Sequence, residues 1–169
     1  MSKSKSTVVI ADKFLCDDVE IGDYVKLTLP NLVWKVDTIT GAGVGGDIDV
    51  PLVGLADAMS VQIDTRAISK DNLPRLMLPG DRALEARFRR QSLAPGGGVQ
   101  LIDTKVFLTA MASGVTLGGV QRGAATDSNF TMSVKRIRWL DDGKELFVFA
   151  PGDETLRING QDYSRYLQI

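Results

Sequence analysis

The chain has 169 residues, of which 44% are hydrophobic and 24% charged, values that argue against disorder and suit one soluble domain spanning residues 1–169. Its 20 basic and 21 acidic residues leave a net charge of -1, so no overall field draws it toward a phosphate backbone or an anionic membrane. Tight nucleic-acid binding is therefore not expected.

Two residue types narrow the function further. Histidine is absent, which removes the commonest general base and the commonest metal ligand, so we expect no enzyme activity and no metal site. Cys16 is the single cysteine, so an intrachain disulfide is impossible and a packing role is expected for it. No apolar run approaches the roughly 20 residues of a membrane-spanning helix, and we expect neither a signal peptide nor a membrane anchor.

The first third of the chain predicts short strands joined by turns and loops. Residues 1–6 alternate Ser and Lys and are expected to form a flexible N-terminal arm, followed by a strand at 7–10. Strand-forming residues at 24–29 and 32–36 flank a Pro-Asn turn. The segment 41–51 contains four glycines, which predicts a long loop, and loops of this kind are usually functional.

The middle of the chain alternates between two periodicities. Segments 58–68 and 84–90 have apolar residues at every second position, which predicts strands with one buried and one wet face. Between them, segment 69–78 has apolar residues at helical spacing after a cap at Ser69 or Asp71, which predicts a short helix.

The last third returns to strands. The most specific local signal is the Asp-Gly pair at 142–143, which predicts a tight hairpin turn because both residues accept a positive φ. Asp162 is expected to cap a last helical turn that ends at Tyr166. The expected segments are one or two strands at 99–117, a flexible polar stretch at 118–127, and strands at 129–140, 145–149 and 156–158. The fold class is therefore mainly β, a sandwich or barrel with one short flanking helix.

The glycines at 41–46 have the spacing of a dinucleotide-binding fingerprint, with Asp64 following at about the expected distance. That motif requires a helix directly after the glycines, so that its N-terminal amides can hold the pyrophosphate. Here the glycines lead into Asp-Ile-Asp-Val-Pro, where no helix can start, and Asp47 and Asp49 would repel phosphate. We therefore expect no nucleotide cofactor.

The remaining charged residues are best explained as solvated sheet faces or contacts between subunits. Asp141 and Asp142 lack the spacing of a calcium loop. Asp64 and Glu85 have the chemistry of an acid–base pair, yet nothing in the sequence brings them together, and no catalytic residue is assigned. The arginine clusters at 87–90 and 136–138 lack the interleaved aromatics that stack on single-stranded nucleic acid.

Several segments, taken in order, resemble the major tail tube proteins of contractile-tailed phages. The resemblance covers residues 14–169, and its most specific part is an Asp-Gly-Lys-Glu turn followed by Asn-Gly-Gln-Asp. The segments that carry it are 25–32 (VKLTLPNL), the glycine loop with Asp49-Val50, 54–59, 114–123, 142–146 (DGKEL) and 158–163 (INGQDY).

The resemblance implies a β-sandwich or barrel-like fold, similar to the tube protein of type VI secretion systems. It also implies hexameric rings that stack into a hollow tube inside a contractile sheath, in a virion assembled in the host bacterial cytoplasm. Expected partners are further copies of the chain, the tail sheath, the baseplate, the tail terminator, and a tape-measure protein and transient DNA in the lumen. A monomeric β-sandwich binding or adaptor module is the alternative.

Two groups of residues are the candidates for these contacts. The lumen candidates are the polar positions of the two alternating strands: Ser60, Gln62, Asp64, Arg66, Glu85, Arg87, Arg89 and Gln91. The candidates for contacts between subunits lie in the glycine-rich loop and in the polar stretch at 118–127: Gly41, Gly43, Gly45, Gly46, Asp47, Asp49 and Arg122. The N-terminal arm is expected to take part as well.

Overall fold

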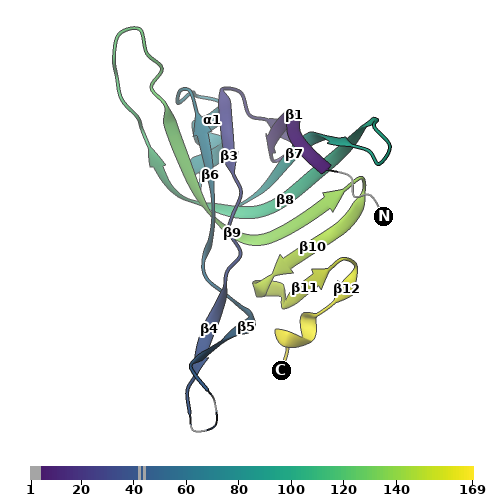
Figure 1. Cartoon of the computed structure of the whole chain (residues 1–169). Coiled ribbons are helices and arrows are strands. Elements are labelled where there is room, and N and C mark those ends of the chain that lie inside the picture. Colours follow the sequence, from purple (N-terminus) through teal and green to yellow (C-terminus); the bar gives the residue numbers. More distant parts are fainter. Residues whose placement is uncertain (1–4, 42, 44) are drawn as a thin grey trace.

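The computed structural model describes residues 5–41, 43 and 45–169 (Figure 1). They form antiparallel β-structure with one short α-helix, the fold class that the sequence predicts. The strands are β1 (Lys5–Cys16), β2 (Val19–Glu20), β3 (Tyr24–Thr28), β4 (Trp34–Ile39), β5 (Ile48–Ala56), β6 (Met59–Thr65), β7 (Asp81–Leu93), β8 (Val99–Thr116), β9 (Ser128–Asp141), β10 (Lys144–Ala150), β11 (Thr155–Ile158) and β12 (Gln161–Asp162). The helix is α1 (Asn72–Met77), and the 3-10 turns are η1 (Pro151–Asp153) and η2 (Ser164–Tyr166).

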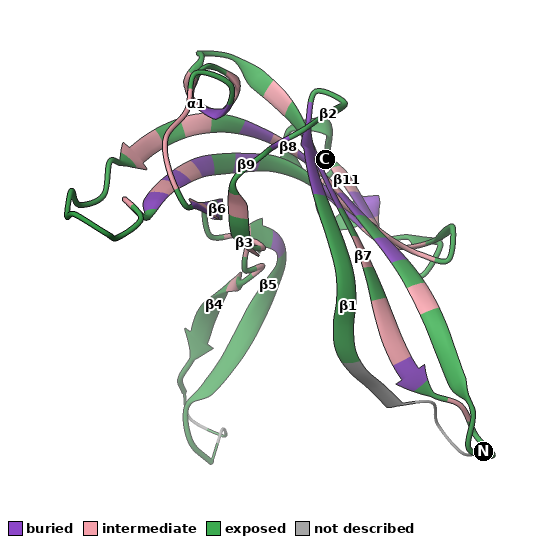
Figure 2. Ribbon diagram, turned by 90° about the horizontal axis from the view of Figure 1, so that it is seen from above, coloured by how far each residue is buried: buried purple, intermediate pink, exposed green. Residues whose placement is uncertain are grey.

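Within the described residues, β4 and β5 form a separate hairpin and the other strands form one sheet. The order in that sheet is β12-β11-β10-β9-β8-β7-β1-β2, and β6 pairs with both β9 and β3. The first half of β9 pairs with β6 and the second half with β10, so β9 belongs to two half-sheets. Long, curved β8 and β9 join the two halves (Figures 1 and 2).

A β-bulge marks the boundary between the half-sheets. The register of β8 against β9 shifts between Thr109 and Ala110. At this point β9 has two consecutive exposed residues, Lys135 and Arg136, between buried Val134 and Ile137. The extra residue bends the strand and turns the sheet.

The core lies on the inside of the curved sheet. Alternate residues of β6, β7, β8 and β9 enter one cluster, in which Val61, Phe130 and Leu84 are at most 1% exposed. The two sheet edges β1 and β3 approach across this core: the rings of Phe14 and Tyr24 lie 5.7 Å apart between centroids. No backbone pairing joins β1 to β3 in the described part of the chain, so the barrel-like body keeps an open seam there.

The helix and the two C-terminal turns follow their predicted local signals. Ser69 is the cap: its hydroxyl accepts the Asn72 N–H at 3.2 Å, and the Asn72 side chain accepts the Ser69 N–H at 2.8 Å. The β9–β10 turn has φ of 47° at Asp142 and 77° at Gly143, as an Asp-Gly hairpin requires. Asp162 accepts the Ser164 N–H at 2.8 Å at the start of η2.

Three element boundaries were wrong, whereas the segment predicted as one or two strands at 99–117 is the single strand β8. The strand predicted at 7–10 is part of the longer β1. The strand predicted at 32–36 begins and ends later, as β4, and pairs with β5 rather than with β3. β5 begins at Ile48, inside the predicted loop, because β-branched residues there pair with β4.

The structure describes only part of the N-terminal arm predicted at residues 1–6. Residues 1–4 lie outside the described residues. Lys5 and Ser6 begin β1, where their backbone pairs with Leu93 and Ser92 of β7.

Candidate assembly surfaces

The β4–β5 hairpin projects from the body (Figure 1). On one of its faces Ile39 lies opposite Ile48, and Asp37 lies opposite Val50. Ile39 and Ile48 are 49% and 54% exposed. A two-stranded hairpin alone is marginally stable in water, so a surface that covered this apolar face would stabilise it.

The predicted contact residues of the glycine-rich segment lie at the hairpin tip and on β5. A methyl group added at Gly41, Gly43, Gly45 or Gly46 would meet no atom within 4 Å. Packing inside the chain therefore does not demand these glycines, although Gly43 has a φ of +104°. Residues 42 and 44 lie outside the described residues.

The acidic residues of the same hairpin face solvent. Asp49 accepts a hydrogen bond from the Thr38 hydroxyl at 2.7 Å. Asp37 and Asp47 form no ion pair within the described part of the chain. Their charges remain free to act on another molecule.

The β8–β9 loop at residues 117–127 lies at the opposite end of the body from the hairpin (Figure 1). Its base is fixed by a hydrogen bond from the Gly119 N–H to the Thr126 carbonyl at 3.0 Å. Gly118 has a φ of +82°, and a Cβ there would stand 1.9 Å from that carbonyl oxygen. Beyond this base Val120 is 97% exposed, and the predicted contact residue Arg122 is exposed too.

The lumen candidates share the solvent-facing side of the large sheet. In β6 and β7 the neighbours of these residues point into the core, so alternation places the candidates outward. Glu85 is the most buried, at 8%. Arg66 follows the end of β6, where its N–H donates to the Asp23 carbonyl at 2.9 Å. The candidates on strands are Ser60, Gln62 and Asp64 on β6, and Glu85, Arg87, Arg89 and Gln91 on β7.

The bulge separates these candidates into two groups, because β6 and the greater part of β7 belong to different half-sheets. On the β6 side, Ser60 lies opposite Ser133 and Gln62 opposite Thr131. The Ser113 hydroxyl of β8 donates to the Thr131 carbonyl at 3.0 Å. We call these five residues the small-polar surface.

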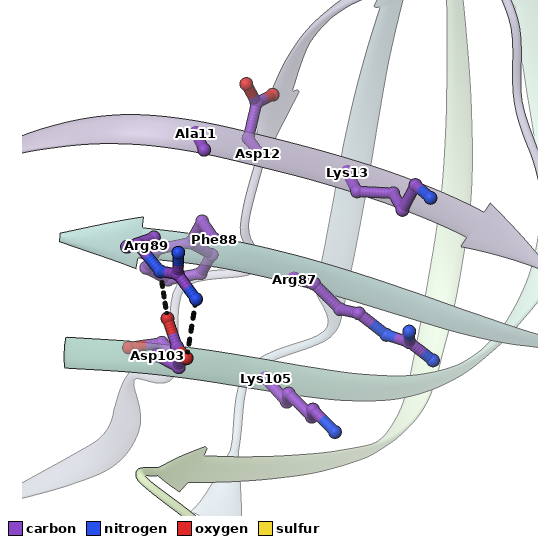
Figure 3. A pocket seen from close by; sticks show the side chains of 9 residues that line it. Ala11, Asp12, Lys13, Arg87, Phe88, Arg89, Asp103 and Lys105 are labelled. Atoms are coloured by element: carbon purple, nitrogen blue, oxygen red, sulfur yellow. Dashed lines mark hydrogen bonds and ion pairs between the residues drawn. The ribbon is translucent and has the colours of Figure 1, made fainter. Parts of the chain in front are cut away.

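The β7 side of the wet face is charged. Lys13, Arg87 and Lys105 lie directly opposite one another on β1, β7 and β8, and Figure 3 shows them in one row. Beside this row the Arg89 guanidinium holds Asp103 with two hydrogen bonds of 2.6 and 3.0 Å. These bonds lower the pKa of the Asp103 carboxyl. A shallow hollow of about 270 Å³ is lined by this row and by the Arg89–Asp103 pair.

Like charges directly opposite on adjacent strands repel, so the row needs counter-ions. Glu85 supplies one to Arg87 at 2.5 Å, and Glu20 supplies one to Lys13 at 3.1 Å. Lys105 has no ion pair within the described residues. The row therefore keeps an unbalanced positive charge.

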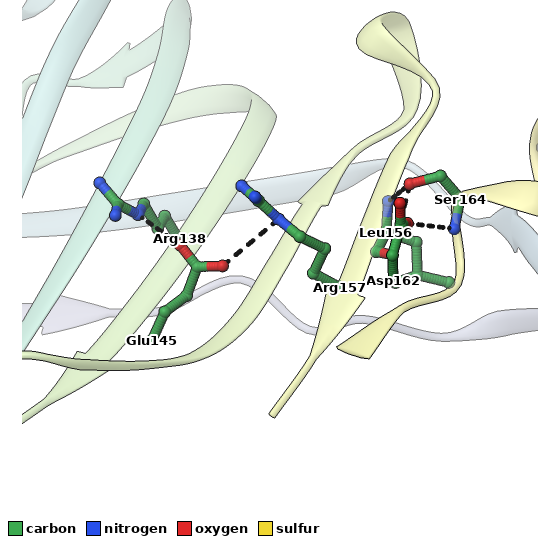
Figure 4. A network of polar contacts seen from close by, with 6 residues as sticks. All are labelled: Arg138, Glu145, Leu156, Arg157, Asp162 and Ser164. Carbon is green, nitrogen blue, oxygen red and sulfur yellow. Dashed lines mark hydrogen bonds and ion pairs between the residues drawn. The ribbon is translucent and has the colours of Figure 1, made fainter. Parts of the chain in front are cut away.

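A second ionic group continues the charged face onto the C-terminal strands. Glu145 of β10 bridges Arg138 of β9 at 2.9 Å and Arg157 of β11 at 3.3 Å (Figure 4). Nearby, hydrogen bonding from the side chain and then the backbone N–H of Ser164 lowers the pKa of the Asp162 carboxyl, and the N–H bond is shown in Figure 4. One carboxylate thus orders two guanidinium groups and ties three strands together.

The geometry gives no support to a chemical site. The glycines of the fingerprint lead into β5 instead of a helix. Asp64 and Glu85 stand on strands that β9 and β8 separate, and Glu85 is held by Arg87. Among the described residues, no group of acidic or sulfur side chains could hold a metal ion, and no helix could cross a membrane. Burial raises the pKa of the Cys16 thiol to about 11, which keeps it unreactive.

Sequence reasoning missed the β8 and β9 part of the small-polar surface. In residues 129–134 polar Asn, Thr and Ser alternate with apolar Phe, Met and Val, the same signal that identified Ser60 and Gln62. Thr131 and Ser133 could have been assigned from it. Ser113 could not, because a register shift between Ala112 and Gly114 interrupts the alternation of β8.

Two comparisons with known proteins bear on these surfaces. A family model described as phage tail tube protein FII matches residues 11–167. The match includes the hairpin, the β8–β9 loop and both parts of the wet face. A search among curated proteins finds no match for the chain.

Proposed function

We propose, for a chain that belongs to the phage tail tube protein FII family, that it forms hexameric rings which stack into the inner tube of a contractile tail. As a member of this family the chain is a structural tail tube subunit and a component of the virion. The tube is the conduit through which the genome or another cargo crosses the host envelope.

The observation that carries this proposal is the match of the family model over nearly the whole chain. The exposed apolar face of the β4–β5 hairpin supports it, because self-assembly would cover that face. Hairpin and β8–β9 loop project from opposite ends of the body (Figure 1). A contact between two different surfaces of identical subunits does not close after two copies, so it can repeat from subunit to subunit. Stacked rings require such a contact.

We assign the lumen to the small-polar surface. Each phosphate held by a Lys or Arg adds salt-sensitive affinity for DNA, so small neutral side chains allow DNA to pass without being retained. The lumen role predicted for Glu85, Arg87, Arg89 and Gln91 stays a prediction, since they lie beyond the bulge. In this arrangement the tape-measure protein and DNA contact the small-polar surface. The tail sheath, the baseplate and the tail terminator contact other faces of the tube.

The first experiment is negative-stain electron microscopy of the purified, concentrated protein. Rings or hollow tubes of constant diameter would establish assembly. A protein that stays monomeric at every concentration would contradict spontaneous assembly and would favour the binding-module alternative.

Thiol labelling of assembled tubes tests the lumen. Thr131→Cys and Arg89→Cys place one accessible thiol on each part of the wet face, and buried Cys16 stays silent. A lumen thiol reacts with a small maleimide but not with one attached to a bulky polymer. We expect this pattern for Thr131→Cys alone. Protection of both positions would extend the lumen to the charged face, and bulky labelling of Thr131→Cys would exclude our assignment.

A further inference from the structure

The open seam between β1 and β3 presents two unpaired strand edges. β1 pairs with β7 on one side. On the other side, within the described residues, Leu15 and Cys16 pair with β2 and the Phe14 carbonyl accepts the Ile21 N–H. β3 pairs with β6 alone among the described strands. An unpaired edge is a template for an additional strand.

Side chains, not backbone, bridge the seam. The Tyr24 hydroxyl donates to the Asp12 carboxylate at 2.5 Å, and burial together with that carboxylate raises the pKa of Tyr24. The ring of Phe14 packs beside Tyr24. These side-chain contacts connect the two edges, and no backbone hydrogen bond pairs β1 with β3 in the described chain.

A hollow of about 380 Å³ lies between the edges. Apolar side chains line it, with Val9 50% and Val25 57% exposed. Three cations, Lys13, Lys26 and Arg87, and the Asp12 carboxylate complete the lining. Glu20 and Glu85 neutralise Lys13 and Arg87, so Lys26 supplies the unpaired positive charge of the hollow. Lys26 lies opposite Asp64 in register, but it makes no ion pair within the described residues.

The β4–β5 hairpin has the complementary properties. Its apolar face carries Ile39, Ile48 and Val50, all exposed. Lys35 and three aspartates, Asp37, Asp47 and Asp49, give it a balance of −2 over residues 34–56. It is extended, and its outer edges are unpaired in the described chain.

From this match of shape, polarity and charge, we propose that the hairpin of one subunit docks in the β1–β3 seam of a second copy and pairs with an open edge. The inference rests on the proposed self-assembly. Because the hairpin and the seam are different surfaces of the same chain, each subunit both gives and receives a hairpin, so the contact propagates.

Charge reversal tests the contact. Lys26→Glu and Asp37→Lys each place like charges together, and neither removes an ion pair within the described chain. We expect each to raise the protein concentration needed for tube formation by roughly tenfold or more at low salt. The double variant Lys26→Glu/Asp37→Lys restores opposite charges and should recover assembly.

Lys144→Glu is the matched control, because it makes the same charge change at an exposed turn far from the seam in sequence and on another strand pair. Thermal unfolding of each variant checks that the subunit stays folded, above all for Lys26→Glu, which places a second carboxylate beside Asp64. If Lys26→Glu assembles no worse than Lys144→Glu, or the double variant fails to recover, the seam is not the docking site.

Cross-linking gives a second readout that does not depend on charge. Subunits with Val25→Cys are mixed with subunits with Val50→Cys, a position on the apolar face of the hairpin, and treated with a short bismaleimide, while Cys16 stays buried. Cross-linked pairs that form in the mixture and in neither sample alone support docking, and their absence from tubes refutes it. Wild-type tubes, together with mixed variant tubes that form no such cross-link, overturn this inference alone, whereas a wild-type protein that never assembles overturns the proposed function as well.

Discussion

The barrel-like body and the β4–β5 hairpin are built from similar strands but obtain their stability in different ways. In the body, alternate residues of both half-sheets enter one core. In the hairpin, the strands pair only with each other, and residues such as Ile39 and Ile48 remain about half exposed. The comparison separates residues that stabilise the folded subunit from exposed residues that would be buried only by contact with another subunit.

The largest effect on the subunit itself is expected from a core substitution. Phe130 is fully buried between the half-sheets, so Phe130→Ala should lower the free energy of unfolding by about 3–5 kcal/mol. That is a large share of the stability of an ordinary domain. Urea unfolding followed by circular dichroism measures it, and a loss below about 1 kcal/mol would mean that the body does not depend on this core as described.

The next effect comes from the base of the β8–β9 loop. Gly118→Ala requires a Cβ 1.9 Å from the Thr126 carbonyl oxygen, at a φ of +82°. We expect a loss of roughly 1–3 kcal/mol in the free energy of unfolding. Gly119→Ala is the matched control, since a Cβ there meets nothing within 4 Å. Equal stability of the two variants in urea would contradict the described backbone.

A smaller, pH-dependent effect is expected on the charged face. The hydrogen bonds from Arg89 lower the pKa of Asp103 in the folded state. The resulting stabilisation is present above the ordinary carboxyl pKa of about 4, and it is lost as the pH falls through the lowered value. Urea unfolding of the wild type and Asp103→Asn should therefore differ slightly at pH 5 and converge toward pH 2. A difference that grows on acidification would reverse the assigned sign.

Sequence reasoning succeeded wherever a local signal decides the structure. The alternation of β6, the Asp142–Gly143 turn and the cap at Ser69 depend on neighbouring residues, and all three were predicted. It failed where long-range pairing decides: nothing near Trp34 in the sequence indicates that β4 pairs with β5 rather than β3.

The candidate site shows the same limit. Alternation placed the lumen candidates on one sheet face, but it cannot show that the bulge at Lys135 and Arg136 separates them into two groups. The seam was not predicted for a related reason. It arises from edges that are far apart in the sheet order and that come together only when the sheet curves.

The smallest effect on the folding of the subunit is expected in the hairpin, together with the greatest effect on assembly. The double variant Ile39→Thr/Ile48→Thr keeps β-branched residues in both strands and removes apolar surface that the isolated subunit leaves exposed. Its free energy of unfolding should therefore stay within about 0.5 kcal/mol of the wild type, as for other surface substitutions. Tube formation, followed by sedimentation and electron microscopy, should be strongly reduced, because the covered hairpin face loses its hydrophobic contribution. Val99→Thr/Leu101→Thr is the matched control, a similarly exposed apolar pair on β8, outside both the hairpin and the seam. If the hairpin variant assembled normally, its apolar face would have to be covered by something other than a second subunit.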